Sequence, residues 1–290
     1  MDSVIERSPA KLNLSLDVLS RWEDGYHELQ MVMCSVDLTD QVEVTLTGDG
    51  VTAAESNLPW LPADQRNLAV KAVKAFYAEL GEEDPGVHIR MKKRVPVGAG
   101  MAGGSANAAA VLRALNTLTA AGMDADRLRR VALSVGSDVP YCVAGGMALA
   151  RGRGEILTPL PPMPECAVVI CKPAFSISTA DLFHKLDSRT LKTHPDTAGM
   201  IVALEKNDLG GVARRMYNVF EDVLPRNCAE VFSIRGSLLD NGALGAVMTG
   251  TGSAVFGIFD GEGAAKRAYD ALAPHYRDCF LTRICRESLL

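Results

Sequence analysis

The 290-residue chain lacks several features that would assign it to a restricted class of protein. Its seven cysteines are odd in number and include no pair with CxxC spacing, and most lie in apolar runs, so buried reduced thiols are expected. No apolar run approaches the ~20 residues of a transmembrane helix, and residues 1–7 lack the apolar core of a signal peptide. We therefore expect a cytoplasmic protein without a membrane partner.

Basic residues are not in excess either. The 30 basic and 35 acidic residues give a net charge of −5, whereas a nucleic-acid-binding protein usually carries a basic patch. Apolar residues make up 48% and charged residues 22% of the chain, which is ordinary for a globular protein long enough for two domains. We expect no nucleic-acid partner, and any phosphate site would rely on local amides and a few placed cations.

The signatures of the commonest nucleotide-binding folds are also missing. The glycine-rich stretch from Pro96 to Asn107 ends in Gly-Gly-Ser, whereas a Walker A loop ends in Gly-Lys-Ser/Thr. No His-Arg-Asp or Asp-Phe-Gly of a protein kinase follows it. Gly98-x-Gly100-x-x-Gly103, with Asp124 downstream, formally matches the dinucleotide fingerprint. However, residues 92–96, Lys-Lys-Arg-Val-Pro, are not the buried apolar strand which that fingerprint needs.

The stretch does contain four glycines in seven residues, from Gly98 to Gly104, and the strong helix formers of residues 108–115 follow it. Glycine lets backbone N–H groups converge where side chains would block them, and the start of a helix favours negative charge. Ser105 either caps this helix or touches a phosphate or its metal. The pattern indicates an anion site and, taken alone, leaves a dinucleotide and a triphosphate both open.

Hydrophobic periodicity predicts an α+β chain. Strands are expected over residues 11–18, 41–46, 88–94, 147–152, 166–171, 244–248, 254–259 and 280–284. Helices are expected over 67–80, from the glycine loop to about 122, and over 126–135, 179–186, 196–205, 208–216, 227–241 and 261–273, with 51–63 a loop. The proline-dense segment 157–164 predicts a domain junction, which gives an ATP-binding and catalytic domain over 1–158 and a substrate-contributing domain over 159–290.

Two polar stretches have more than one interpretation. Lys11, Asn13, Ser15 and Asp17 share one face of the first strand, and that face is either solvated or the wall of a cleft. Residues 92–94 carry a basic face that either steers ATP or is solvated, and we favour the solvated face.

Asp138 lies at a predicted helix start, where Ser137 or Asp138 would cap and Pro140 would fall in the first turn. A lysine and an aspartate together suit phosphoryl transfer to a hydroxyl group. The aspartate accepts the alcohol proton, and the lysine offsets charge on the transferring group. Sequence spacing alone does not show that Lys11 and Asp138 meet.

Three stretches together resemble the motifs of the GHMP kinases, the small-molecule kinases named for galactokinase, homoserine kinase, mevalonate kinase and phosphomevalonate kinase. They are Pro9-Ala10-Lys11-Leu12-Asn13-Leu14, residues 96–107 and Thr249-Gly250-Thr251-Gly252-Ser253. The resemblance covers nearly the whole chain. It implies an N-terminal domain like ribosomal protein S5 domain 2, a ferredoxin-like C-terminal domain, and a cleft between them for ATP, Mg²⁺ and the substrate.

Residues 24–30, Asp-Gly-Tyr-His-Glu-Leu-Gln, and residues 136–140 are most similar to one branch of that family. This branch phosphorylates the 2-hydroxyl of a cytidine-diphosphate-linked methylerythritol. The resemblance implies that Lys11 and Asp138 are the catalytic pair, with Asp138 as general base. It implies ATP contacts from Asn67, near the adenine, and from Pro96, Val97, Gly98, Ala99, Gly100, Met101, Ala102, Gly103, Gly104, Ser105 and Ala106.

The resemblance also implies a substrate site with two ends. Asn13 would contact the erythritol-phosphate end, where Thr249 and Gly250 close the cleft. Tyr26 and His27 would hold the cytidine, His27 by hydrogen bonds to the base, and Phe183 would stack on its other side. The metal ligands are not assigned. Two other functions stay open: a kinase of a mevalonate- or homoserine-like alcohol, and a non-catalytic nucleotide-binding sensor. We expect a monomer or a weak homodimer. Ala102 departs from the family, in which glycine is frequent at that position.

Overall fold

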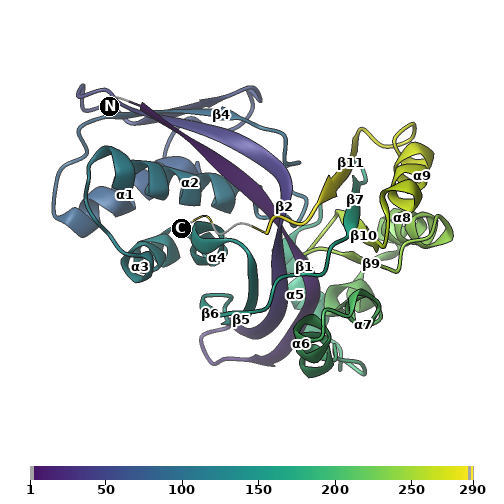
Figure 1. The fold of residues 1–290 in the computed structure, drawn as a ribbon. Coiled ribbons are helices and arrows are strands. Elements are labelled where there is room, and N and C mark those ends of the chain that lie inside the picture. Colours follow the sequence, from purple (N-terminus) through teal and green to yellow (C-terminus); the bar gives the residue numbers. More distant parts are fainter. Residues whose placement is uncertain (1–2, 287–288, 290) are drawn as a thin grey trace.

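Two long antiparallel strands, β1 (Ser3–Arg21) and β2 (His27–Leu46), run through the middle of the molecule (Figure 1). The computed structural model describes residues 3–286 and 289. The strands predicted over 11–18 and 41–46 are parts of this pair. Its register shifts at three places, between Pro9 and Lys11, between Asn13 and Ser15, and between Val18 and Ser20. Such bulges break the alternation of apolar and polar residues, which explains why periodicity underestimated the length of both strands.

The first sheet has the order β3-β4-β2-β1-β8, and β5 and β6 extend it from β2. Its remaining strands are β3 (Ala53–Ser56), β4 (Val87–Lys92), β5 (Met147–Gly152), β6 (Ile156–Pro159) and β8 (Tyr217–Asn218). The loop prediction for 51–63 is wrong over the four residues of β3, because so short a strand shows no periodicity. β6 overlaps the start of the predicted junction at 157–164 and pairs with β5, so part of that proline-dense segment belongs to the first sheet.

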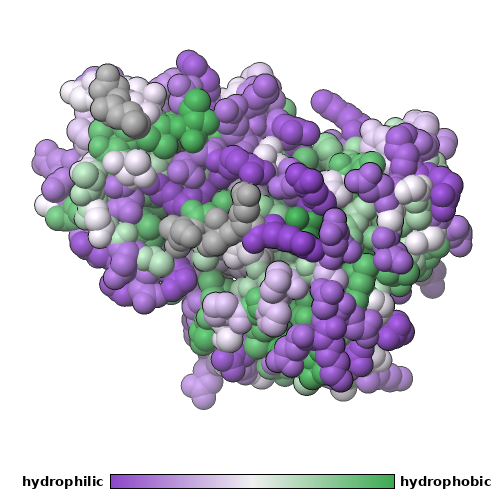
Figure 2. All heavy atoms as spheres, viewed as in Figure 1, coloured by the Kyte–Doolittle hydropathy of each residue, from purple (hydrophilic) through white to green (hydrophobic). Residues whose placement is uncertain are grey.

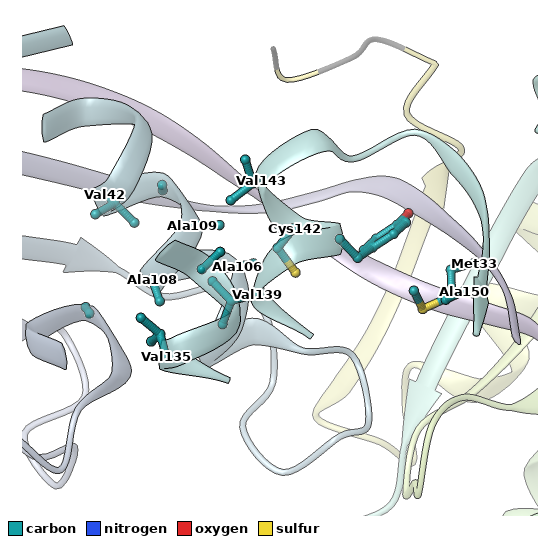
Figure 3. Packing of buried hydrophobic residues seen from close by; sticks show 14 of the residues in the cluster. Met33, Val42, Ala106, Ala108, Ala109, Val135, Val139, Cys142, Val143 and Ala150 are labelled. Atoms are coloured by element: carbon teal, nitrogen blue, oxygen red, sulfur yellow. The ribbon is translucent and has the colours of Figure 1, made fainter. Parts of the chain in front are cut away.

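Helices α1 (Leu68–Leu80), α2 (Gly103–Leu118), α3 (Ala125–Val135) and α4 (Val139–Ala144) pack together beside the first sheet (Figure 1). Every residue of α2 from 106 to 115 is buried, Asn107 and Arg113 included, so this part of the helix is enclosed on all sides. Its alanines lie close to Val135, Val139 and Cys142 (Figure 3). The helix begins after Ala102, which has a left-handed φ of 55° and makes no side-chain cap. Of the two alternatives for Ser105, the cap is therefore excluded, and the helix ends four residues before 122.

The second sheet has the order β11-β7-β10-β9, with all neighbours antiparallel. Its elements are β7 (Ala167–Lys172), α8 (Ala229–Asp240), β9 (Gly245–Met248), β10 (Val255–Phe259), α9 (Glu262–Leu272) and β11 (Asp278–Arg283). This βαββαβ succession with the first and last strands adjacent at one side is a ferredoxin-like arrangement. It confirms the C-terminal fold that the family resemblance implies.

Three α-helices, one short strand and two 3₁₀-helices, η1 (Val219–Val223) and η2 (Arg226–Cys228), separate β7 from α8. The helices are α5 (Thr179–Asp187), α6 (Thr197–Glu205) and α7 (Leu209–Ala213). The helix predicted over 208–216 ends early because the chain turns back to the first sheet, where β8 pairs with β1 in parallel. A segment of the second half thereby completes the sheet of the first.

The two halves also share their apolar cores. Leu16 and Phe76 belong to the same buried cluster as Phe220 and Val255, and a second cluster likewise combines Leu12 with the β7 strand. All seven cysteines are buried, as predicted. Polar side chains cover much of the face in Figure 2, with apolar groups scattered among them. Within residues 3–286 and 289, no helix has the length and apolarity needed to cross a bilayer.

Candidate active site

A cleft of about 1060 Å³ is bordered by the first sheet, the glycine loop, α5 and the second glycine loop. Most of the residues predicted to bind ATP or substrate line it. They are Lys11, Tyr26, His27, Asn67, Pro96, Val97, Gly98, Ala99, Gly100, Met101, Ala102, Gly103, Gly104, Ser105, Asp138, Phe183 and Gly250. Asn13, Ala106 and Thr249 are buried behind its wall. The fold thus brings together residues that lie up to 239 positions apart in the sequence, from Lys11 to Gly250.

The two glycine loops contact each other through their backbones. Gly100 has a φ of 74°, and a Cβ atom built on it would lie 2.1 Å from the carbonyl oxygen of Thr249. The Thr249 hydroxyl donates to the Gly100 carbonyl oxygen (3.3 Å), and the Ala254 amide donates to the Ala99 carbonyl oxygen (3.2 Å). Only glycine fits this close approach. The path of the phosphate-binding loop is therefore fixed by the second loop.

Lys11 is buried on β1 at the edge of the cleft. Its Nζ donates to Asn13 Oδ1 at 2.6 Å, and the same oxygen accepts the Gly250 amide at 3.0 Å. Asn13 is fully buried and makes no surface of the cleft. Asn13 therefore orients the ammonium group and the second glycine loop from behind, and its predicted contact with substrate stays a prediction. The polar face of β1 is not solvated, since Ser15 and Asp17 are buried as Lys11 and Asn13 are.

Asp138 precedes α4 at the position of its N-cap, as predicted, but its carboxylate makes no capping hydrogen bond. It is half-buried and lines the cleft. Arg113 of α2 holds the other end of the short helix by donating to the carbonyl oxygens of Cys142 (3.0 Å) and Val143 (3.4 Å). A carboxylate free of capping, on a helix fixed at its far end, is available to a ligand in the cleft.

Lys11 and Asp138 both act on one buried thiol. Burial raises the pKa of Cys142, the Asp138 carboxylate raises it further, and the Lys11 ammonium lowers it. Both side chains also line the cleft. No ion pair joins them among the described contacts, and their pairing at the reacting atoms stays a prediction.

A second group of side chains lies on the α5 side of the cleft. His27 Nε2 and Asp187 Oδ1 are 2.6 Å apart, and Arg21 lies 3.4 Å from the same carboxylate. The His27 ring stacks on Phe183 with centroids 4.5 Å apart and an interplanar angle of 25°. The imidazole is held both by its edge and by its face, so its orientation is fixed before any ligand arrives.

Tyr26 lies at the exposed margin of the cleft. The Arg153 guanidinium is 3.7 Å from the centre of its ring and forms an ion pair with Asp24. Arg153 and Asp187 also line the cleft, and neither was predicted from the sequence. Asp187 follows Phe183 by one helical turn, so helical spacing could have indicated it. Arg153 comes near Tyr26 only through the pairing of β5 with β2, and no local signal shows that.

The remaining predicted contacts surround the glycine loop. Asn67 caps α1, accepting the Ala69 amide at 3.0 Å, and donates to the Pro62 carbonyl oxygen at 2.8 Å. It lines the cleft beside apolar groups, which include Leu61, Leu68 and Met91. The solvated basic face favoured for residues 92–94 is wrong in part. Lys92 and Arg94 are exposed, but Lys93 is buried and paired with Asp40.

Comparison with known proteins identifies the family. The model of the GHMP kinases N-terminal domain matches residues 67–146, and that of the GHMP kinases C-terminal domain matches residues 200–278. Together they cover more than half of the chain. The chain belongs to the GHMP kinases. Kinases of this family use ATP, and membership excludes the dinucleotide-binding interpretation of residues 98–103.

The similar GHMP kinases include curated proteins of one activity. A 4-diphosphocytidyl-2-C-methyl-D-erythritol kinase of Clostridium perfringens is 41% identical over 97% of this chain and 98% of its own length. One from Shouchella clausii is 40% identical over 97% and 94%. A crystal structure of 4-(cytidine 5'-diphospho)-2C-methyl-D-erythritol kinase is 32% identical, with a TM-score of 0.81 over 97% of this chain and 99% of that one. A homoserine kinase of Cytophaga hutchinsonii, 21% identical with a TM-score of 0.76 over 99% and 96%, shares the fold.

Proposed function

We propose that this GHMP kinase transfers the γ-phosphoryl group of ATP to the 2-hydroxyl of 4-diphosphocytidyl-2-C-methyl-D-erythritol. The observation that carries the proposal is a single cleft lined by the glycine loop, by Lys11 and Asp138, and by the group around His27. Relatives with that activity match nearly the whole chain at about 40% identity. Buried thiols with no pairing pattern suit a reducing compartment, so we place the protein in the cytoplasm. We further propose that it is a monomer or a weak homodimer.

The chemistry follows from the two charged side chains. The Asp138 carboxylate accepts the proton of the 2-hydroxyl as its oxygen attacks the γ-phosphorus. The bond from that phosphorus to the bridging oxygen breaks, and ADP leaves with the electron pair. Lys11, oriented by Asn13, offsets the negative charge on the transferring group. The backbone amides of residues 97–104 hold the remaining phosphate charge.

Mg²⁺ is part of this proposal. The described residues contain no cluster of three metal-ligating side chains. That suits a metal which arrives with ATP, because Mg²⁺ is usually held by one or two carboxylates together with substrate phosphates. The Ser105 hydroxyl, which lines the cleft at the start of α2, is the side chain we propose as its protein ligand. The ion would neutralise the phosphate charge.

The activity test uses purified protein, ATP and Mg²⁺ with one alcohol at a time. We expect ADP release with 4-diphosphocytidyl-2-C-methyl-D-erythritol, and a new phosphomonoester on its 2-oxygen detected by phosphorus NMR. Mevalonate and homoserine should give no ADP above the rate without alcohol. Turnover of either of these, and none of the cytidine compound, would reassign the substrate within the family. ATP binding without turnover of any alcohol would favour the sensor.

The His27 group supplies a second prediction, for specificity. Replacing His27 by alanine removes the ring stacked on Phe183 and the partner of Asp187. We expect KM for the cytidine substrate to rise about 10- to 100-fold, as for the loss of a charge-assisted hydrogen bond, with KM for ATP unchanged. His88→Ala on the outer part of β4, where the imidazole is 39% exposed, is the matched control. Steady-state kinetics in both substrates measures the effect, and an equal rise of both KM values contradicts the assignment.

A further inference from the structure

A buried charged cluster lies beneath the glycine loop, and the proposed chemistry does not use it. It consists of Ser8, Asp40, Lys93 and Asn107, which are 0%, 1%, 8% and 2% exposed. Removing a carboxylate and an ammonium group from water costs several kcal/mol for each ion unless hydrogen bonds and pairing offset it. Because such a cluster is costly to bury and lies next to a ligand site, we expect it to contribute to the function of that site.

Asp40 makes four hydrogen bonds, two with each carboxylate oxygen. Oδ1 accepts the backbone amides of Arg94 (2.6 Å) and Val95 (2.8 Å). Oδ2 accepts Lys93 Nζ and the side-chain amide of Asn107 (2.9 Å). Its first oxygen thus binds the segment that leads into the glycine loop, and its second oxygen binds the helix that leaves it.

The position of Asp40 on β2 explains this arrangement. The ladder between β2 and β4 ends where Gln41 pairs with Lys92, and Asp40 is the next residue of β2. Beyond that point the chain leaves the sheet, so the amides of Arg94 and Val95 have no strand partner. The Asp40 carboxylate replaces the missing strand and holds the chain at the edge of the sheet as it enters the loop.

The cluster is in contact with the loop itself. Lys93 Nζ donates to Asn107 Oδ1 at 2.7 Å, and both residues line the cleft, whereas Asp40 does not. A Cβ atom built on Gly103, the first residue of α2, would lie 3.1 Å from Val95 Cγ1 and 3.5 Å from Lys93 Nζ. The glycine loop therefore rests on the groups that Asp40 holds, and a displacement of those groups would move the loop.

We propose that Asp40 is a positioning residue for ATP: it fixes both ends of the glycine loop so that the loop amides converge on the phosphates. This inference rests on the proposed function only in that the loop binds ATP. Asp40 touches neither substrate. Its effect is expected in the affinity for ATP and not in the affinity for the alcohol.

The test compares three variants by calorimetric titration with a non-hydrolysable ATP analogue, without any alcohol. Asp40→Asn leaves Lys93 buried without a counter-ion, and we expect Kd to rise about tenfold or more, as when a hydrogen bond to a charged group is lost. Asp37→Asn, on the same strand, removes a carboxylate paired with Arg7 and Arg283 at the surface and should change Kd less than about twofold.

The third variant combines Asp40→Asn with Asn107→Asp and returns a carboxylate to the side of Lys93. The new amide oxygen at position 40 can accept the amides of Arg94 and Val95. Its NH₂ group can donate to the new carboxylate at position 107 but also faces the Lys93 ammonium group, which bonded to the original oxygen. We expect Kd to lie between those of Asp40→Asn and of the original protein, since Lys93 regains a counter-ion.

The outcomes separate positioning from mere stability. A lower melting temperature of Asp40→Asn with an unchanged Kd overturns the proposal, and so does a folded double variant that fails to recover affinity. If Asp40→Asn does not fold, Asn107→Ala removes the helix side of the cluster, which is bonded to Asp40, Lys93 and Ser8, and an unchanged Kd there overturns the proposal too. If the original protein binds the ATP analogue but does not phosphorylate the cytidine substrate, the proposed function is overturned and the proposal for Asp40 is not.

Discussion

Asp138→Asn is expected to lower kcat by about 10³-fold, within the range found when a general base is removed, while Kd for ATP changes less than twofold. Asparagine has the same shape as aspartate but cannot accept the hydroxyl proton. Because the Asp138 carboxylate makes no capping hydrogen bond, the substitution breaks no bond that holds α4. The loss should therefore fall on the chemical step and leave folding and nucleotide binding intact.

The matched control for this prediction is Asp124→Asn. Asp124 is the N-cap of the neighbouring helix α3, and its side chain does accept the Arg127 amide, at 2.8 Å. Asparagine is an equally good cap, so both activity and stability should stay near those of the original protein. Single-turnover kinetics with the cytidine substrate and calorimetry with an ATP analogue measure the two quantities. A surviving kcat in Asp138→Asn would mean that another group accepts the proton.

Local sequence patterns predicted the elements that have strong periodicity. The strand over 166–171 and the helix over 67–80 were found to within one residue because an unbroken apolar pattern sets their limits. The parts that failed depend on partners far away in sequence. β8 consists of Tyr217–Asn218 and exists only because β1 is beside it, so no signal within two residues could show it.

The candidate site followed the same division. The glycine loop is visible in sequence because glycine is required where a Cβ atom would clash, as at Gly100. Lys93 could not be placed, since a lysine in a run of basic residues is usually solvated and only Asp40, 53 positions earlier, makes its burial possible. Asn13 lies behind the cleft wall, where its side chain binds Lys11 and the Gly250 amide, and its predicted contact with substrate stays a prediction. The motif indicated the right strand without showing which side of the cleft wall each residue occupies.

The contact between the two glycine loops leads to the second large effect, that of Gly100→Ala. The new methyl group would lie 2.1 Å from the Thr249 carbonyl oxygen, on a residue whose φ is 74°. A side chain in that left-handed conformation costs roughly 1–2 kcal/mol, and the overlap forces the loops apart at a further cost of roughly 1–3 kcal/mol. We expect a free energy of unfolding lower by about 3 kcal/mol and an ATP affinity about 100-fold weaker, because displaced amides no longer converge on the phosphates.

Gly122→Ala separates the two causes. Gly122 also has a left-handed φ, of 63°, but a Cβ atom built there meets nothing within 4 Å. This variant therefore carries the backbone strain without the overlap, and should lose about 1 kcal/mol of unfolding free energy with no change in ATP affinity. Chemical denaturation and titration with an ATP analogue give both quantities for both variants. If Gly100→Ala loses no more stability than Gly122→Ala and binds the analogue normally, the second loop does not fix the first. If Gly100→Ala loses ATP affinity and Gly122→Ala does not, the contact between Gly100 and Thr249 is what holds the amides of the glycine loop in position.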